Sequence, residues 1–318
     1  MTRPLRLFCV ALASAICLSA NAASDAPLPK RSKSDRDINA IGHRQLSGTG
    51  PGIGNWYSPQ KEREFGEKYS AAFEKSVTIL HDPAIDAYIN AVAQRITQNS
   101  DATLPSTVRV VNIAEPGAFT LPGGHLYLTS GLLLKMQNEG ELASVLARGV
   151  AHTALHTFSR ALTRAVLLQT TMAPATTGAS FMAMPCGMGL DNSDLGTAPT
   201  LLISFCRGFE LDADYFGIQY LYKAGYDPGC FLNVVERLWT PAPGGTLWQA
   251  FSVFPPLPDR LRQLRKEIQE ILPGRDTDLV SRSEFQDFQE RLRGFAPAAP
   301  SQPHTVPTLI RQGEPASQ

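Results

Sequence analysis

The stretch 115–152 restricts the fold most strongly, because it joins a glycine turn, a strand pattern and a helix pattern without a break. Pro122-Gly123-Gly124 is a turn signal. His125–Thr129 then alternates polar and apolar side chains, as a half-buried strand does. The pattern next becomes helical and predicts one long helix over about 139–160, because apolar residues recur with helical spacing at Leu142, Val145, Leu146 and Val150. The chain therefore needs a sheet packed against helices.

The remaining pattern is mostly helical. Asp82-Pro83 combines an N-cap residue with proline at the first helical position, which predicts a helix to about Gln98. The β-branched run Thr107–Ile113 predicts a second strand. Further helices are predicted from Ser58 with Phe65, Tyr69 and Phe73 on one side, over about 207–224, after Asp227-Pro228, after Pro258-Asp259, and over Ser283–Leu292. The predicted class is α+β, mostly helical, with a small sheet.

The two ends of the chain differ from its centre. Residues 1–22 combine a basic start, the apolar run Leu7–Leu18 and a small-residue cleavage triplet, and so predict an export signal. Residues 23–57 are rich in proline, glycine, serine and charge, which predicts a flexible lead-in. The folded domain is predicted over 58–294, followed by a disordered proline-rich tail over 295–318. We expect an exported protein, periplasmic in a Gram-negative cell and otherwise secreted.

Charge and cysteine content exclude some classes of protein. The 29 basic and 29 acidic side chains among 318 residues give no net charge, which argues against a nucleic-acid binder. Loss of residues 1–22 would leave the mature chain slightly acidic and retain Cys186, Cys206 and Cys230. The sequence is compatible with one disulfide between two of these cysteines, and equally with three free thiols. The uncharged run 165–184 is too polar for a membrane span, and predicts a buried or surface-lying hairpin that could touch a membrane surface.

Two segments resemble the family-forty-eight zinc metallopeptidases, the HtpX/BepA-like group of the zincin clan. The first is 115–152, from Glu-Pro-Gly-Ala-Phe through the glycine turn to His152; the second is Arg207-Gly-Phe-Glu210-Leu-Asp-Ala-Asp214-Tyr-Phe-Gly217 with Ala224-Gly-Tyr-Asp-Pro228. The resemblance covers about 58–266 and implies a mostly helical zincin-like metallopeptidase domain. It implies that His152 and Glu210 are zinc ligands, that Asp214 supports them, and that the strand up to Thr129 is the edge along which a peptide lies.

The chain departs from the family pattern where the reaction takes place. The family helix carries His-Glu-x-x-His, in which two histidines bind zinc and the glutamate activates water. Here Arg148 replaces the first histidine and Gly149 replaces the glutamate. Arginine stays protonated and cannot bind zinc, and glycine offers no base. Two further positions depart as well, since Phe254-Pro255 stands where the family has His-Pro and Gly117 where it has asparagine.

The altered motif leaves the metal question open at this stage. His152 and His156 have i,i+4 spacing, so a zinc site shifted by one helical turn is conceivable, with Thr153 in the base position. Our preferred hypothesis is that Arg148 replaces the metal and pairs with Glu210, because a guanidinium suits bidentate contact with a carboxylate. Gly149 is expected to cost about 1 kcal/mol of helix stability relative to alanine. Zinc is thus expected to be absent or weakly bound.

Three functions remain open. The first, which we favour, is an exported pseudoprotease that binds polypeptide or unfolded envelope protein in quality control. The second is an active metalloendopeptidase with an altered zinc ligand set. The third is a structural or regulatory partner of an active paralogue. The sequence does not indicate an oligomeric state.

Overall fold

The computed structural model describes residues 31–46, 54–172, 200–238, 257–275 and 283–295. The predicted α+β class with a small sheet is confirmed. The predicted signal peptide, the proline-rich tail after residue 295, Phe254-Pro255 and Cys186 lie outside the described residues. The elements are α2 (Lys33–Arg36), η1 (Ile38–Ala40), α3 (Pro59–Glu74), β1 (Ile79–Leu80), α4 (Pro83–Gln98), β2 (Thr107–Val111), β3 (Ala118–Leu121), η3 (Pro122–Gly124), β4 (His125–Thr129), α5 (Ser130–Lys135), α6 (Glu139–Ala154), α7 (Thr157–Met172), α8 (Thr200–Lys223), α9 (Gly229–Leu238), α11 (Leu257–Glu270) and α12 (Glu284–Arg293).

The sheet has four strands in the order β1-β2-β4-β3. β2 runs parallel to β4, while β1 and β3 are antiparallel to their neighbours. The strand predicted as the edge is therefore interior, because β4 pairs with β2 on one side and with β3 on the other. The edge on that side of the sheet is β3, a strand that the sequence patterns did not predict.

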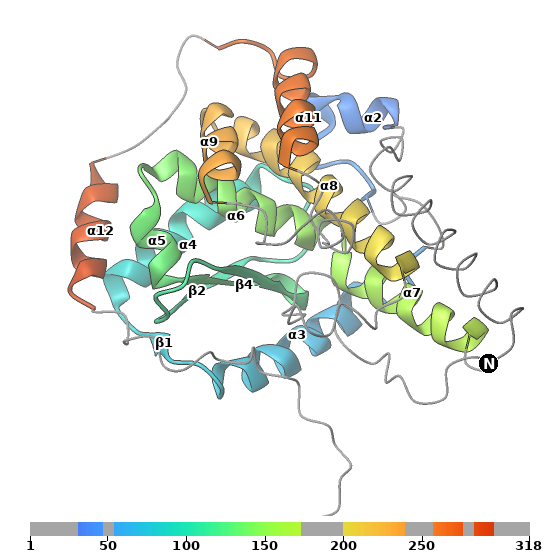
Figure 1. Ribbon diagram of the computed structural model, residues 1–318, viewed down its shortest axis with the longest axis horizontal. Coiled ribbons are helices and arrows are strands. Elements are labelled where there is room, and N and C mark those ends of the chain that lie inside the picture. The colour runs from blue at the N-terminus through green and yellow to red at the C-terminus, as the bar shows by residue number, and fades with distance from the viewer. Residues whose placement is uncertain (1–30, 47–53, 173–199, 239–256, 276–282, 296–318) are drawn as a thin grey trace, which may run out of the picture.

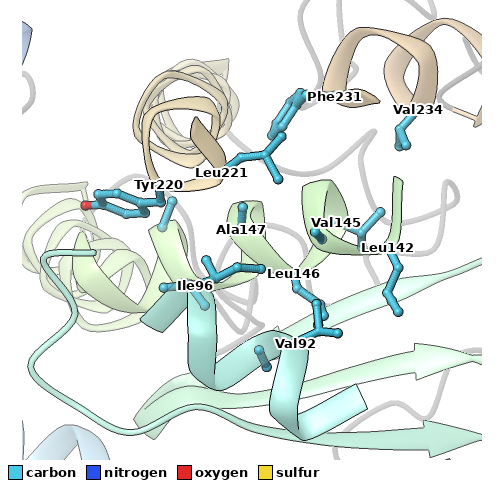
Figure 2. Packing of buried hydrophobic residues seen from close by; sticks show 14 of the residues in the cluster. Val92, Ile96, Leu142, Val145, Leu146, Ala147, Tyr220, Leu221, Phe231 and Val234 are labelled. Carbon is cyan, nitrogen blue, oxygen red and sulfur yellow. The ribbon is translucent and has the colours of Figure 1, made fainter. Parts of the chain in front are cut away.

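The helices cover both faces of the sheet, as Figure 1 shows, with α4 and α6 on one side and α3 on the other. α6 is the central helix, and 14 of its 16 residues are buried. Figure 2 shows its apolar side chains between those of α4 and those of α8 and α9; the labelled residues are Val92, Ile96, Leu142, Val145, Leu146, Ala147, Tyr220, Leu221, Phe231 and Val234. A helix packed on all sides in this way is held at a fixed height above the sheet.

The predicted long helix over 139–160 is broken in two. α6 ends at Ala154 and α7 begins at Thr157, with His156 between them at φ 50°. This left-handed conformation is costly for a residue with a β-carbon. It is held in place by Glu62 of α3, whose Oε2 lies 2.8 Å from His156 Nδ1 and accepts a 2.8 Å hydrogen bond from Ser159 Oγ. The apolar stripe continues across the break, so helical periodicity alone did not predict it.

Part of the predicted flexible lead-in is structured and lies against α8. Residues 31–46, which we call the strap, include α2 with a capping box at Ser32 and the short helix η1. Arg44 makes a buried ion pair with Asp101 at 2.7 Å and donates to Gln219 of α8. The arginines of a charge-rich lead-in are thus partners of buried acids, which a reading of local composition does not reveal.

The described residues include no helix that is long and apolar enough to cross a membrane. The uncharged run 165–184 continues α7 as far as Met172, and its remainder lies outside the described residues. Cys230 is buried in α9, with its Sγ 3.7 Å from Asn138 Oδ1. The side chain of Cys206 is not described, so the choice between a disulfide and free thiols stays open.

Candidate functional site: the altered metal centre

Arg148 and His152 are the two residues of α6 that are not fully buried. Their side chains lie on one face of the helix, one turn apart, and each is about 11% exposed. α8 passes close to this face. A β-carbon added to Gly217 would lie 3.1 Å from the Cα of Arg148, so this glycine permits the close approach of the two helices. The face of α6 that would carry a metal in the family pattern therefore points at α8.

The carboxylates of α8 meet Arg148 rather than a metal ligand. The Arg148 guanidinium forms an ion pair through Nη2 with Glu210 Oε2, and its Nε donates to Asp214 Oδ1 at 3.0 Å. Glu210 and Asp214 are both 2% exposed and share one helix face through their i,i+4 spacing. The pairing of Arg148 with Glu210, which we expected from the sequence, is thus observed. Desolvation lowers the pKa of Arg148 to about 10, against the opposing effect of Asp214, so the side chain remains a cation at neutral pH.

Arg260 of α11 completes the charge network. Its guanidinium contacts both carboxylate oxygens of Asp214, with 2.7 Å from Nη2 to Oδ1. Asp214 therefore lies between two arginines, Arg148 and Arg260. The position of Arg260 shortly after a predicted helix start gives no sign of a partner 46 residues earlier in the chain.

His152 is neutral in this environment. Its Nε2 lies 3.7 Å from Glu210 Oε2 and its Nδ1 lies 3.3 Å from Thr157 Oγ1. Desolvation lowers the pKa of His152 well below its usual value, and the positive charges of Arg148 and Arg260 act in the same direction. His152 and Glu210 are thus brought together as the family pattern implies, but the guanidinium of Arg148 is paired with the same oxygen of Glu210.

Gly149 lies close to the side chains of two neighbouring strands, β4 and β3. A β-carbon built at this position would lie 2.4 Å from Leu126 Cδ2 and 3.2 Å from Thr120 Oγ1. From the sequence, this glycine is expected only to lower the stability of the helix. The structure shows that the space beside it is filled by Leu126 of β4, so restoring a glutamate at this position requires the Leu126 side chain to move.

The metal site shifted by one turn is not formed. His156 lies outside α6, and its Nδ1 contacts Glu62 instead of facing His152. The i,i+4 geometry that the alternative required ends with the helix at Ala154. His156 is therefore part of the junction between α6, α7 and α3.

The donor set does not fit a catalytic zinc ion. Such sites use three protein ligands plus water, whereas only His152 and Glu210 remain here, and Glu210 is already paired with the permanent cation of Arg148. Within the described part of the chain, no group of three or more histidine, cysteine, aspartate or glutamate side chains could hold a metal ion. The residues present neutralise the buried carboxylates without a metal.

A second group of buried charges, which the sequence patterns did not predict, lies between α8, the strap and α11. Arg31 of the strap pairs with Asp212 at 2.6 Å and lies over the ring of Tyr215 at 4.1 Å. Burial raises the pKa of Glu267 of α11 well above its usual value. The charges of Asp214 and Asp212 act in the same direction, and that of Arg31 opposes them. Asp212 lies two residues from both Glu210 and Asp214, and residues at this spacing point to opposite sides of a helix. Asp212 therefore faces the strap, whereas Glu210 and Asp214 face α6.

The lowered pKa of His152 predicts a pH dependence of stability. The unfolded chain takes up a proton below about pH 6.5, which the folded chain accepts only at much lower pH, so acidification costs stability. We expect the wild type to lose up to about 1.4 kcal/mol per pH unit below pH 6.5 relative to His152→Asn. Urea unfolding of both proteins between pH 7.5 and pH 5 measures this difference. Parallel profiles for the two proteins would contradict the assignment of a buried neutral His152.

Comparison with known proteins agrees with this geometry. Residues 83–268 match the model of Peptidase family M48, and the chain belongs to this family. It is 31% identical over 237 residues to a protein of Yersinia pestis named beta-barrel assembly-enhancing protease, an alignment that covers 72% of this chain and 48% of that protein. The protein of the same name from Escherichia coli K12 is 29% identical over 237 residues, which cover 72% of this chain and 48% of that protein.

A third relative comes from a eukaryote. The mitochondrial metalloendopeptidase OMA1 of Schizosaccharomyces pombe is 31% identical over 189 residues, which cover 58% of this chain and 52% of that protein. The chain spans about half the length of the curated relatives it matches. The family is zinc-dependent as a class, so the replacement of its first histidine ligand by Arg148 and of its catalytic glutamate by Gly149 is a departure within a shared α+β fold.

Proposed function

We propose that this protein is an exported, non-catalytic member of the family that binds polypeptide in the former substrate groove. The observation that carries the proposal is the Arg148–Glu210 ion pair, since it places a side-chain cation on the carboxylate that would bind zinc. Proteolysis by this family needs a metal-bound water and a base that removes its proton. The arrangement supports neither requirement.

The edge strand β3, which lies beside α6, supports binding of an extended chain. Thr129 N donates to Gly117 O at 3.0 Å, so the hydrogen-bonded pairs between β3 and β4 fall at every second residue from this point. Phe119 and Leu121 therefore face β4 with their backbone groups, while those of Ala118 and Thr120 point to the other side of β3. The described residues place no strand on that side. A polypeptide adding there would gain backbone hydrogen bonds.

The proposal includes a cellular role in the envelope. The predicted signal over 1–22 favours export to the periplasm, and two bacterial relatives are named for the enhancement of β-barrel assembly. We propose that the protein holds unfolded envelope proteins in quality control. The uncharged run 165–184 is proposed as a contact with the membrane surface near such clients.

Binding and hydrolysis are separated by two assays on the full mature chain. We expect no cleavage of fluorescent casein with or without a chelator, and retention of unfolded casein on the immobilised protein. Thr120→Pro removes the outward N–H of β3 and should weaken retention, whereas Thr120→Ala keeps that N–H and serves as the matched control. Chelator-sensitive cleavage would support an active enzyme with an altered ligand set. Absence of retention would leave only a structural or regulatory role.

A further inference from the structure

A row of aromatic side chains lies next to the free edge of the sheet. We call it the aromatic strip, and its members come from three elements that are distant in the sequence: Phe65, Tyr69 and Phe73 of α3, Phe119 of β3 and Phe158 of α7. The strip is partly exposed, because all members except Phe158 keep some solvent-accessible surface. Partly exposed aromatic groups that are held in place by packing are typical of binding surfaces.

The ring contacts within the strip form two groups, one around Phe73 and Phe119 and one around Phe65, Tyr69 and Phe158. Phe73 lies 6.1 Å from Phe119, and Phe65 lies 6.3 Å from Tyr69, measured between ring centroids. Phe158 joins the far end, 5.5 Å from Tyr69 and 5.9 Å from Phe65. α3 is fixed against the end of β3, because Gly66 allows its backbone to touch Pro122. The strip therefore keeps a fixed position relative to the edge strand.

The two faces of the sheet at this edge differ in chemistry. Phe119 and Leu121 point to the α3 face, where Phe119 packs with the small cluster around Tyr127. Thr120 points to the opposite face, where its Oγ1 lies near Gly149 of α6. One face thus carries aromatic side chains, and the other carries the hydroxyl of Thr120 beside α6.

We propose that β3 and the aromatic strip together select extended segments whose every second side chain is aromatic or large and aliphatic. Successive side chains of a strand point to opposite faces. A segment added to β3 therefore directs alternate residues to the strip and the intervening ones to the opposite face beside α6. The partner class is an amphipathic β-strand, exposed before it finds its own sheet. This inference rests on the proposed polypeptide binding and states its specificity.

The test compares two labelled peptides of identical composition by fluorescence anisotropy with the full mature protein. Both have lysine at each end. One alternates phenylalanine and threonine over eight residues, and the other has the four phenylalanines and the four threonines in two blocks. We expect the alternating peptide to bind about tenfold more tightly, since more of its rings reach the strip at once. Tyr69→Ser should reduce this preference, and Trp56→Ser, which alters an aromatic residue outside the strip, should not.

Equal affinities for the two peptides would overturn the inference and leave the proposed polypeptide binding intact. Retention of casein without binding of either peptide would do the same. Failure to bind both peptides and casein would overturn the proposed function as well. Because the comparison of peptides uses the wild-type protein, it stands even if Tyr69→Ser fails to fold.

Discussion

Replacing Arg148 by methionine is expected to lower the free energy of unfolding by about 3–5 kcal/mol, because it leaves Glu210 buried without its cation. Glu210 is 2% exposed, so solvent cannot take over the role of the guanidinium. Asp214 is affected less, since Arg260 remains in contact with both of its oxygens. Urea denaturation at neutral pH measures the loss. Arg262→Met is the control, because Arg262 forms an exposed pair with Asp259 on the surface of α11 and should cost less than about 1 kcal/mol.

A double variant separates the ion pair from simple packing. Arg148→Met combined with Glu210→Gln removes both charges, and we expect it to be more stable than Arg148→Met alone. If Arg148→Met proved as stable as the wild type, the guanidinium would not be the group that neutralises the old metal site.

Replacing Gly66 by alanine is the second substitution with a large expected effect. A β-carbon at this position would lie 2.3 Å from the backbone oxygen of Pro122, so α3 must move away from the end of β3. We expect a loss of about 2–3 kcal/mol in the free energy of unfolding, typical of a strained close contact. Gly208→Ala in α8 is the matched control: among the described residues, nothing beyond the adjacent part of its own helix lies within 4 Å of its β-carbon, and alanine should gain about 1 kcal/mol there.

The Gly66 variant also links stability to binding. Since α3 carries most of the aromatic strip, displacement of this helix should weaken the binding of alternating peptides more than that of unpatterned ones. Equal stability of Gly66→Ala and Gly208→Ala would show that the contact between α3 and Pro122 does not fix the helix.

The elements with a strong local signal were predicted well from the sequence. Asp82 caps α4 through hydrogen bonds to Ala84 N and Ile85 N, and the helix ends at Gln98 as predicted. β4 and α12 also lie where their patterns placed them. In each case the residues that define the element are neighbours in the chain, so a local pattern carries the information.

The predictions were wrong where contacts between residues distant in the sequence determine the structure. The break at His156 depends on Glu62, 94 residues earlier, and no periodicity reports such a contact. β3 was not predicted because its four residues are too few for a clear alternating pattern, and β4 was therefore taken for the edge. The altered centre itself was largely predictable, since Arg148, His152 and Glu210 stand at the positions of the family's zinc ligands. Its completion by Arg260 was not, because that contact comes from the packing of α11 against α8.

The zinc content of the purified full mature chain tests the central claim most directly. The wild type and the double variant Arg148→His, Gly149→Glu should be equilibrated with zinc, dialysed and analysed for metal. We predict far less than one zinc per chain in the wild type, because Arg148 occupies the carboxylate that would bind it, and a higher content in the variant. One zinc per wild-type chain, lost on Glu210→Ala, would contradict the account.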